Sequence, residues 1–144
     1  MQNFIICFEG TASIGKSSTI RELCRLLAPS LVSDDQNDIN EVIEYNSAKI
    51  GIASQGDPYT DVKSKLLAFQ AQRCDIIVCA CRTKRQTKND VYDFANESGY
   101  RIFWVRPYHL NNYSDSSDDK ALVSITNKIN AEGIVRLIST IINQ

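Results

Sequence analysis

The sequence has little of what zinc sites require. Its only histidine is His109, and none of its five cysteines belongs to a C-x-x-C pair. Structural zinc sites combine such pairs with one another or with histidine, so we expect no zinc site. Cysteine outside such patterns behaves as a small buried hydrophobe. We therefore interpret all five as reduced core residues of a cytoplasmic protein.

Long apolar segments and a strong net charge are also missing. No apolar run approaches the length of a membrane span, and the N-terminus lacks the charged region, apolar segment and cleavage site of a secretory signal. The formal net charge is −1, so no global field attracts nucleic acid or an anionic membrane. No internal repeat or low-complexity tract is present. We expect a cytoplasmic protein without a membrane partner, and nucleic acid is not indicated.

One stretch near the N-terminus carries a specific pattern. Residues 10–17 are GTASIGKS, which matches the phosphate-binding loop G-x-x-x-x-G-K-S. Glycines at both ends let the backbone turn and approach a ligand, and the N–H groups of such a loop point at phosphate oxygens. Lys16 would reach the β- and γ-phosphates, and the Ser17 hydroxyl would ligate Mg²⁺. The predicted nucleotide-binding residues are Gly10, Thr11, Ala12, Ser13, Ile14, Gly15, Lys16, Ser17 and Ser18.

The segments on either side of this loop fit its mechanism. Residues 4–8 (FIICF) form a short apolar run that is typical of a buried parallel strand. Residues 17–28 carry the apolar stripe of an amphipathic helix, which ends at Pro29. Loop and flanks, about the first fifth of the chain, resemble the P-loop NTPase superfamily. The resemblance implies ATP and Mg²⁺ as cofactors.

The rest of the chain alternates between strand and helix patterns. Residues 39–45 and 48–54 predict a β-hairpin around Asn46 and Ser47. A helix opening at Asp57 and Pro58 runs to about residue 72, and an apolar strand follows within residues 74–81. The order predicts an α/β fold with a mostly parallel sheet, helices on both faces and an early hairpin. The resemblance implies that this fold is the three-layer P-loop NTPase type.

The C-terminal half continues this alternation. We expect Thr87 to cap a helix that ends at Gly99, followed by a strand at 100–105. One or two helices complete the chain, with a division near Gly133. Residues 1–144 are expected to form a single nucleotide-binding domain. In such a sheet the loops after the parallel strands meet at one rim, where ligands bind.

Acidic residues near this rim are candidates for holding Mg²⁺ beside Ser17. Asp57 follows the second hairpin arm, and it is equally well explained as a helix cap. Asp34 and Asp35 are a second pair, for which a solvated turn is the more ordinary interpretation. Glu9 precedes the loop and is either a base or simply the last residue of the strand.

Cationic and aromatic residues also follow the strands. Four cations lie between residues 82 and 88. We expect Arg82, which directly follows a central strand, to face the transferring phosphoryl group, and the others, including Lys88, to be solvated. Arg106 and Tyr108 follow the last strand, where a nucleotide base or a second substrate would stack.

Within the superfamily, small GTPases and small kinases are the nearest comparisons. Where GTPases carry D-x-x-G this chain has SQGD at 54–57, and the guanine-reading N-K-x-D is replaced by RTKR after Cys81. The chain looks more like a short nucleoside or nucleotide kinase, although it has little room for an arginine-rich lid. We expect ATP-dependent phosphoryl transfer to a small acceptor, with Lys16 and Arg82 as catalytic residues. The alternative is a nucleotide-dependent regulatory or assembly module that acts through a protein partner.

Overall fold

A computed structural model describes residues 2–10, 16–31, 39–54, 62–81, 85–110 and 113–144. At residues 85–87 only the backbone is considered. Several predicted site residues lie outside these ranges, so the expectations placed on them stay predictions. These residues are Thr11, Ala12, Ser13, Ile14, Gly15, Asp34, Asp35, Asp57 and Arg82.

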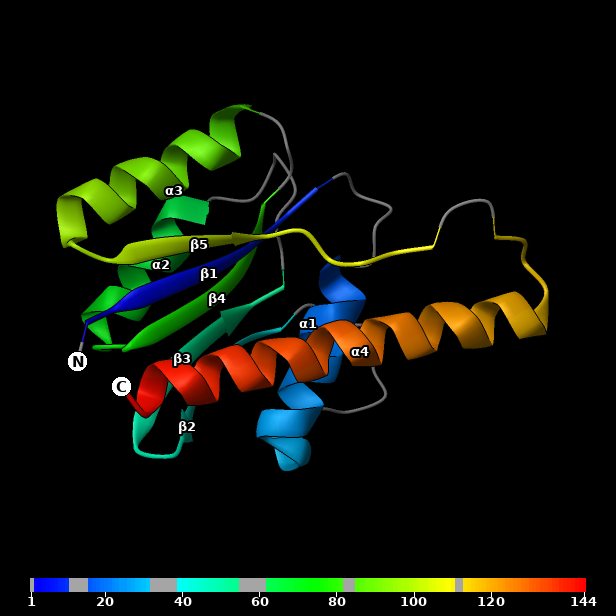
Figure 1. The fold of residues 1–144 in the computed structure, drawn as a ribbon. Coiled ribbons are helices and arrows are strands. Elements are labelled where there is room, and N and C mark those ends of the chain that lie inside the picture. Colours follow the sequence, from blue (N-terminus) through cyan, green and yellow to red (C-terminus); the bar gives the residue numbers. More distant parts are fainter. Residues whose placement is uncertain (1, 11–15, 32–38, 55–61, 82–84, 111–112) are drawn as a thin grey trace.

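Within the described residues, five strands form one sheet in the order β2-β3-β4-β1-β5 (Figure 1). The strands are β1 (Phe4–Glu9), β2 (Asn40–Tyr45), β3 (Ala48–Ala53), β4 (Ile76–Cys81) and β5 (Arg101–Val105). Strands β3, β4, β1 and β5 run parallel, and β2 pairs antiparallel with β3. The predicted α/β class with a mostly parallel sheet is confirmed. Because β4 lies between β3 and β1, the hairpin does not pair with the strand that precedes the glycine-rich motif.

The hairpin forms where the sequence predicts it. Its two turn residues, Asn46 and Ser47, have φ values of 49° and 70°. Two central residues in the left-handed region are the mark of the two-residue turn that matches the twist of paired strands. Tyr45 and Ala48 therefore face each other as the last pair of the ladder.

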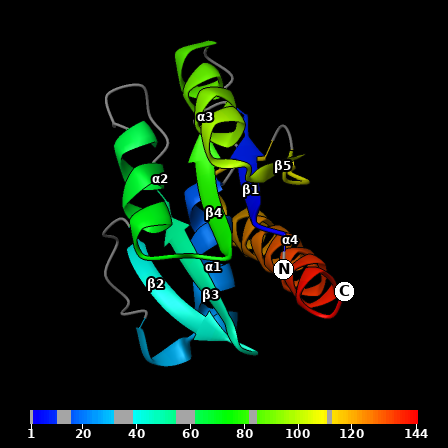
Figure 2. The same ribbon diagram turned by 90° about the vertical axis from the view of Figure 1, so that its left-hand side faces the viewer.

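Helices cover both faces of the sheet, as predicted (Figures 1 and 2). They are α1 (Lys16–Leu27), α2 (Val62–Ala71), α3 (Arg85–Ser98) and α4 (Ser117–Ile142). Alternate side chains of β1 build the two cores. Phe4, Ile6 and Phe8 pack with α1 and α4, whereas Ile5 and Cys7 pack with α2 and α3. Burial on both sides explains why residues 4–8 read as an unbroken apolar run.

Two expected helix boundaries differ from those observed. Helix α3 begins at Arg85, so Thr87 lies inside the first turn and its prediction as the cap is wrong. The C-terminal segment is one helix that passes through Gly133. Burial of Ala131, Ile134 and Ile138 on the sheet outweighs the roughly 1 kcal/mol that a glycine costs inside a helix.

None of the helices in the described part of the chain combines the length and the apolar character needed to cross a membrane.

Candidate functional site

Lys16 lies at the carboxyl ends of two central strands. It opens α1 and is only 6% exposed. Its Nζ donates hydrogen bonds to the carbonyl oxygen of Gly10, at 2.5 Å, and to that of Cys81, at 3.0 Å. Gly10 has a φ of 145°, a conformation that favours glycine. The described ends of the motif therefore place an ammonium group where β1 and β4 end.

Ser17 contacts the segment that follows β3. Its Oγ donates to the carbonyl oxygen of Ser54 at 3.3 Å. Ser54 is 2% exposed and makes two hydrogen bonds with Ile39. Ser54 N donates to the Ile39 carbonyl oxygen at 2.9 Å, and Ser54 Oγ accepts from Ile39 N at 2.7 Å. The ends of β1, β4 and β3 thus meet around the first turn of α1. Ser18 is exposed on this turn, and the predicted magnesium ligand Asp57 lies outside the described residues.

Glu9 ends β1 and is paired with two cations. Its side chain is 12% exposed, with Oε2 at 2.8 Å from Lys88 Nζ and Oε1 at 3.4 Å from Arg106 Nε. The ammonium group of Lys88, and then the guanidinium of Arg106, lower the pKa of the Glu9 carboxyl below its usual value. Glu9 in turn raises the pKa of Lys88. A carboxylate held in this way is a weak proton acceptor, which disfavours the role of Glu9 as a base.

Lys88 lies next to a pair of aromatic rings. Its Nζ lies 4.8 Å from the centre of the Trp104 ring, and Tyr92 lies 5.1 Å from the same ring, centre to centre. From the sequence, Lys88 was expected to be solvated, so its contacts with Glu9 and Trp104 were not predicted. The signal available was the helical spacing of Lys88 and Tyr92, which places them on one face of α3.

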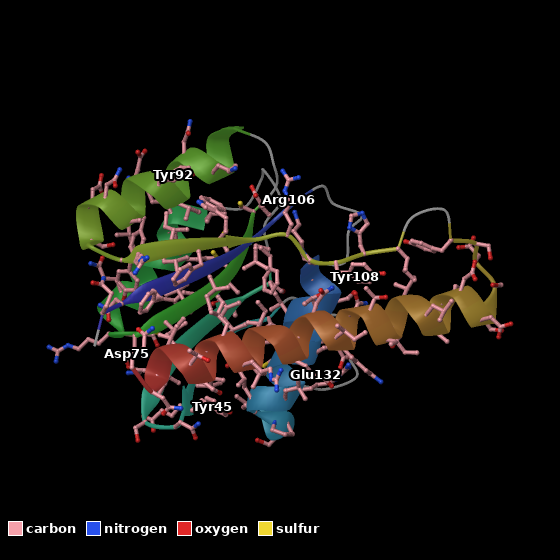
Figure 3. All side chains as sticks on the ribbon, viewed as in Figure 1. Tyr45, Asp75, Tyr92, Arg106, Tyr108 and Glu132 are labelled. Carbon is pink, nitrogen blue, oxygen red and sulfur yellow. The ribbon has the colours of Figure 1, made fainter. Side chains whose placement is uncertain are left out.

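Arg106 and Tyr108 separate after leaving β5 (Figure 3). Arg106 faces Glu9, whereas the backbone of Tyr108 is bound to Asn130 of α4. Tyr108 N donates to Asn130 Oδ1 at 3.0 Å, and Asn130 Nδ2 donates to Tyr108 O at 2.6 Å. The Tyr108 side chain is 63% exposed. These two residues are therefore not brought together as one stacking site.

Asp75 and the five cysteines have structural positions. Asp75 lies at the other end of β4, where its Oδ2 accepts from Lys49 N at 2.9 Å. All five cysteines are buried free thiols. Cys7 Sγ lies 3.4 Å from Cys81 Sγ, so the two thiols pack behind the strand end that accepts from Lys16.

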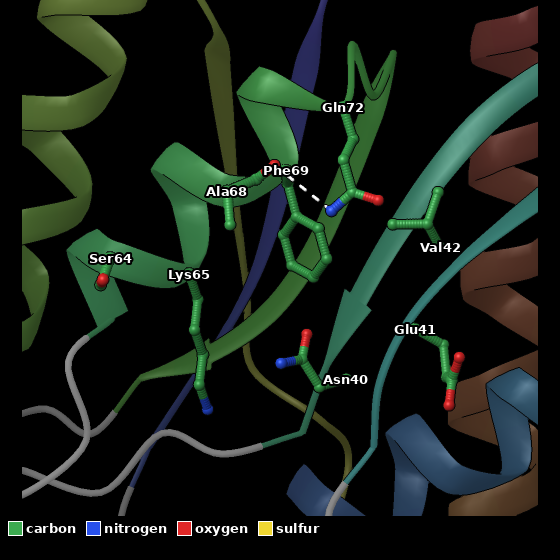
Figure 4. Close-up of a pocket in the computed structure, with 8 residues that line it drawn as sticks. All are labelled: Asn40, Glu41, Val42, Ser64, Lys65, Ala68, Phe69 and Gln72. Carbon is green, nitrogen blue, oxygen red and sulfur yellow. Dashed lines mark hydrogen bonds between the residues drawn. The ribbon is translucent and has the colours of Figure 1, made fainter.

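A separate pocket of about 690 Å³ lies between α2 and the edge strand β2 (Figure 4). Val42 and Phe69 contribute its apolar surface, and Glu41 and Lys65 its charged side chains. Gln72 Nε2 closes one side by donating to Ala68 O at 3.3 Å. No described residue of the glycine-rich motif lines this pocket, and we do not include it in the candidate site.

No family model matches this chain, and comparisons with curated proteins and with solved structures likewise found no match. The case for function therefore depends on the motif and on the geometry around Lys16.

Proposed function

We propose that this chain binds Mg²⁺-ATP through residues 10–18 and transfers the γ-phosphoryl group to a small acceptor. The observation that carries the proposal is the position of Lys16. Its ammonium group lies at the N-terminus of α1 and at the carboxyl ends of β1 and β4, with its hydrogen bonds directed to the Gly10 and Cys81 carbonyl oxygens. In open α/β sheets this rim is where anionic ligands bind.

The described residues suit the chemistry of the expected ligands. A lysine ammonium and the positive end of a helix favour phosphate oxygens, which are stronger acceptors than the carbonyl groups that Lys16 contacts. The Ser17 hydroxyl and the neighbouring Ser54 carbonyl oxygen are the hard oxygen ligands that Mg²⁺ prefers. These residues therefore support a phosphate and magnesium site of the P-loop type.

Each residue has a distinct task in the proposed site. Lys16 holds the β- and γ-phosphate oxygens, and Ser17 holds Mg²⁺. Arg82 is proposed to neutralise charge on the transferring group, and Asp57 to complete the magnesium ligands. ATP supplies the phosphoryl group: a bond forms between the acceptor oxygen and the γ-phosphorus, the bond to the bridging oxygen breaks, and ADP leaves with the electron pair.

Thermal unfolding with and without nucleotide tests the binding step. A ligand at about one hundred times its dissociation constant adds roughly 2.7 kcal/mol, which corresponds to several degrees in Tm. We expect this shift with Mg²⁺-ATP, a smaller one without Mg²⁺, and none in the Lys16→Ala variant. Lys120→Ala, which removes an exposed lysine of α4, serves as the matched control and keeps the shift.

Two results would contradict the proposal. Wild-type protein that shows no shift with any nucleotide does not use the motif for binding. A Lys16→Ala variant that folds and keeps wild-type nucleotide affinity excludes Lys16 from the site. Phosphoryl transfer is then measured as the rate of ADP release. A kinase releases ADP much faster when its acceptor is present than when water is the only acceptor.

A second candidate function is the regulatory or assembly module. One observation favours it: Leu122, Ile125 and Ile129 of α4 are 52%, 52% and 54% exposed. Their spacing places them on one stripe of α4. Exposed apolar stripes often mark contacts with other proteins. Nucleotide binding without acceptor-stimulated ADP release would favour this candidate.

A further inference from the structure

Glu9, Lys88 and Arg106 form a cluster next to the candidate phosphate loop but separate from it. Glu9 is the residue before Gly10, whose carbonyl oxygen accepts from Lys16. The carboxylate of Glu9 binds Lys88 from α3 on one oxygen and Arg106, just after β5, on the other. The three residues thus come from three elements that meet at the rim, with Arg106 beside the end of β1 (Figure 3).

The cluster carries an excess of positive charge. One carboxylate is paired with two cations, and Lys16 adds a third cation close by. Arg106 is 72% exposed, and ion pairs with exposed partners add little to stability, so stabilisation alone is a weak explanation for this second cation on Glu9. An excess cation at a rim that already favours anions points to a second anionic group.

Arg106 presents its guanidinium in a form suited to an anion. Only Nε contacts Glu9, and the side chain is 72% exposed. Within the described part of the chain, the two terminal amino groups of Arg106 have no hydrogen-bond partner. Those groups form the fork that binds phosphate through two parallel hydrogen bonds. Glu9 thereby acts as a positioning residue, because it fixes the orientation of the fork.

Lys88 provides the second cation. Its ammonium is held between the Glu9 carboxylate at 2.8 Å and the face of Trp104 at 4.8 Å, and 31% of the side chain is exposed. An ammonium group has several donors, so its contact with Glu9 leaves others for a ligand. Two cations from α3 and the end of β5 therefore flank the same nearly buried acid.

We propose that Arg106 and Lys88, positioned by Glu9, bind the phosphate group of a phosphorylated acceptor next to the nucleotide site. This inference extends the proposed function by naming the acceptor class, and it rests on that function. The chemistry of transfer favours the same class. An alcohol acceptor has to lose a proton, and Glu9 is too strongly ion-paired to take it. A phosphate monoester is largely deprotonated at neutral pH, so its oxygen can attack without a base.

The first experiment asks whether the anion site exists. Trp104 is the only tryptophan, so its indole N–H resonance reports on the surroundings of Lys88. Inorganic phosphate is titrated against chloride at equal ionic strength. We expect a saturable shift with phosphate only, and dissociation constants raised at least about tenfold in Arg106→Gln and in Lys88→Gln. Arg101→Gln removes an arginine at the opposite end of β5 and leaves the constant unchanged.

The Lys16→Ala variant separates the two sites. We expect phosphate to keep shifting the Trp104 resonance in this variant, although nucleotide binding is lost. The inference is overturned if chloride has the same effect as phosphate, or if Arg106→Gln and Lys88→Gln titrate like the wild type. It also falls if Lys16→Ala abolishes the phosphate effect, because the anion would then be bound by the loop.

The second experiment asks whether the site serves an acceptor. Glycerol phosphate is titrated with and without saturating Mg²⁺-ADP, and glycerol is the uncharged control. We expect glycerol phosphate to bind equally well in both conditions, since transfer needs both substrates bound together, and glycerol to have no effect. Competition with Mg²⁺-ADP overturns the acceptor role. If Mg²⁺-ADP does not bind the wild type, both the proposed function and the acceptor role are overturned. Whether the anion site exists is still decided by the phosphate titration.

Discussion

Tyr100 shows how one polar side chain links several elements of this fold. It is 6% exposed, and its hydroxyl donates to the carbonyl oxygen of Cys74 at 2.5 Å. Its ring lies 5.4 Å from that of Phe94 in α3. Burial raises the pKa of Tyr100 from 10.0 to about 12. One residue thus joins the end of α3 to Cys74, two residues before β4.

We expect Tyr100→Phe to lower the free energy of unfolding by about 1–2 kcal/mol, because the Cys74 carbonyl oxygen loses its partner inside the protein. The folded state favours the protonated hydroxyl, so this stabilisation is complete below pH 10 and is lost as the pH rises towards 12. Urea unfolding over this pH range measures the difference. Tyr113→Phe, at a tyrosine that is 49% exposed, is the control. A pH-independent difference would contradict the prediction.

At the scale of elements, one glycine ends a helix and another lies inside a helix. Gly99 follows α3 with a φ of 80°, and its N–H donates to Ala95 O at 2.9 Å. This left-handed residue ends the helix, as predicted from the sequence. Gly133 lies inside α4, and a Cβ added there would meet nothing within 4 Å. The first position requires glycine, whereas the second only tolerates it.

These positions make a matched pair for substitution by alanine. Gly99→Ala is expected to destabilise the protein by about 1–2 kcal/mol, because the left-handed conformation strains an L residue. Gly133→Ala is expected to stabilise it by up to about 1 kcal/mol through better helix propensity. Thermal unfolding of both variants tests the two signs. Destabilisation by Gly133→Ala would show that α4 needs glycine there.

At the scale of the whole molecule, close packing of α2 on the sheet is the clearest constraint. Gly51 of β3 faces Phe69 of α2, and a Cβ on Gly51 would lie 2.6 Å from the Phe69 ring. Phe69 is 2% exposed and belongs to the core on that side of the sheet. The aromatic ring occupies space that exists only because residue 51 has no side chain.

Gly51→Ala is therefore expected to destabilise the protein by about 1–3 kcal/mol through overpacking. Phe69→Ala removes the ring atoms that the added methyl group would meet, so the double variant should lose less stability than the sum of the two single changes. A double-mutant cycle by urea unfolding measures this coupling. Additive effects would show that the ring moves aside without cost.

The local patterns decided which elements form. The apolar runs predicted β1 and β4, the residues Asn46 and Ser47 predicted the hairpin, and Gly99 predicted the end of α3. Each of these signals depends on neighbouring residues, so it can be read along the chain. The start of α3 was misplaced because a threonine followed by an acid at the third position resembles a cap even inside a helix.

By itself, the sequence determined the α/β alternation, the hairpin and a phosphate-loop pattern at residues 10–17. Only the tertiary structure decided that β4 separates β3 from β1, that Lys16 contacts the end of β4, and that Lys88 joins Arg106 on Glu9. Strand order depends on long-range pairing, and the Glu9 cluster joins residues far apart in the chain. Contacts of this kind depend on the packing of whole elements and leave no local periodicity to read.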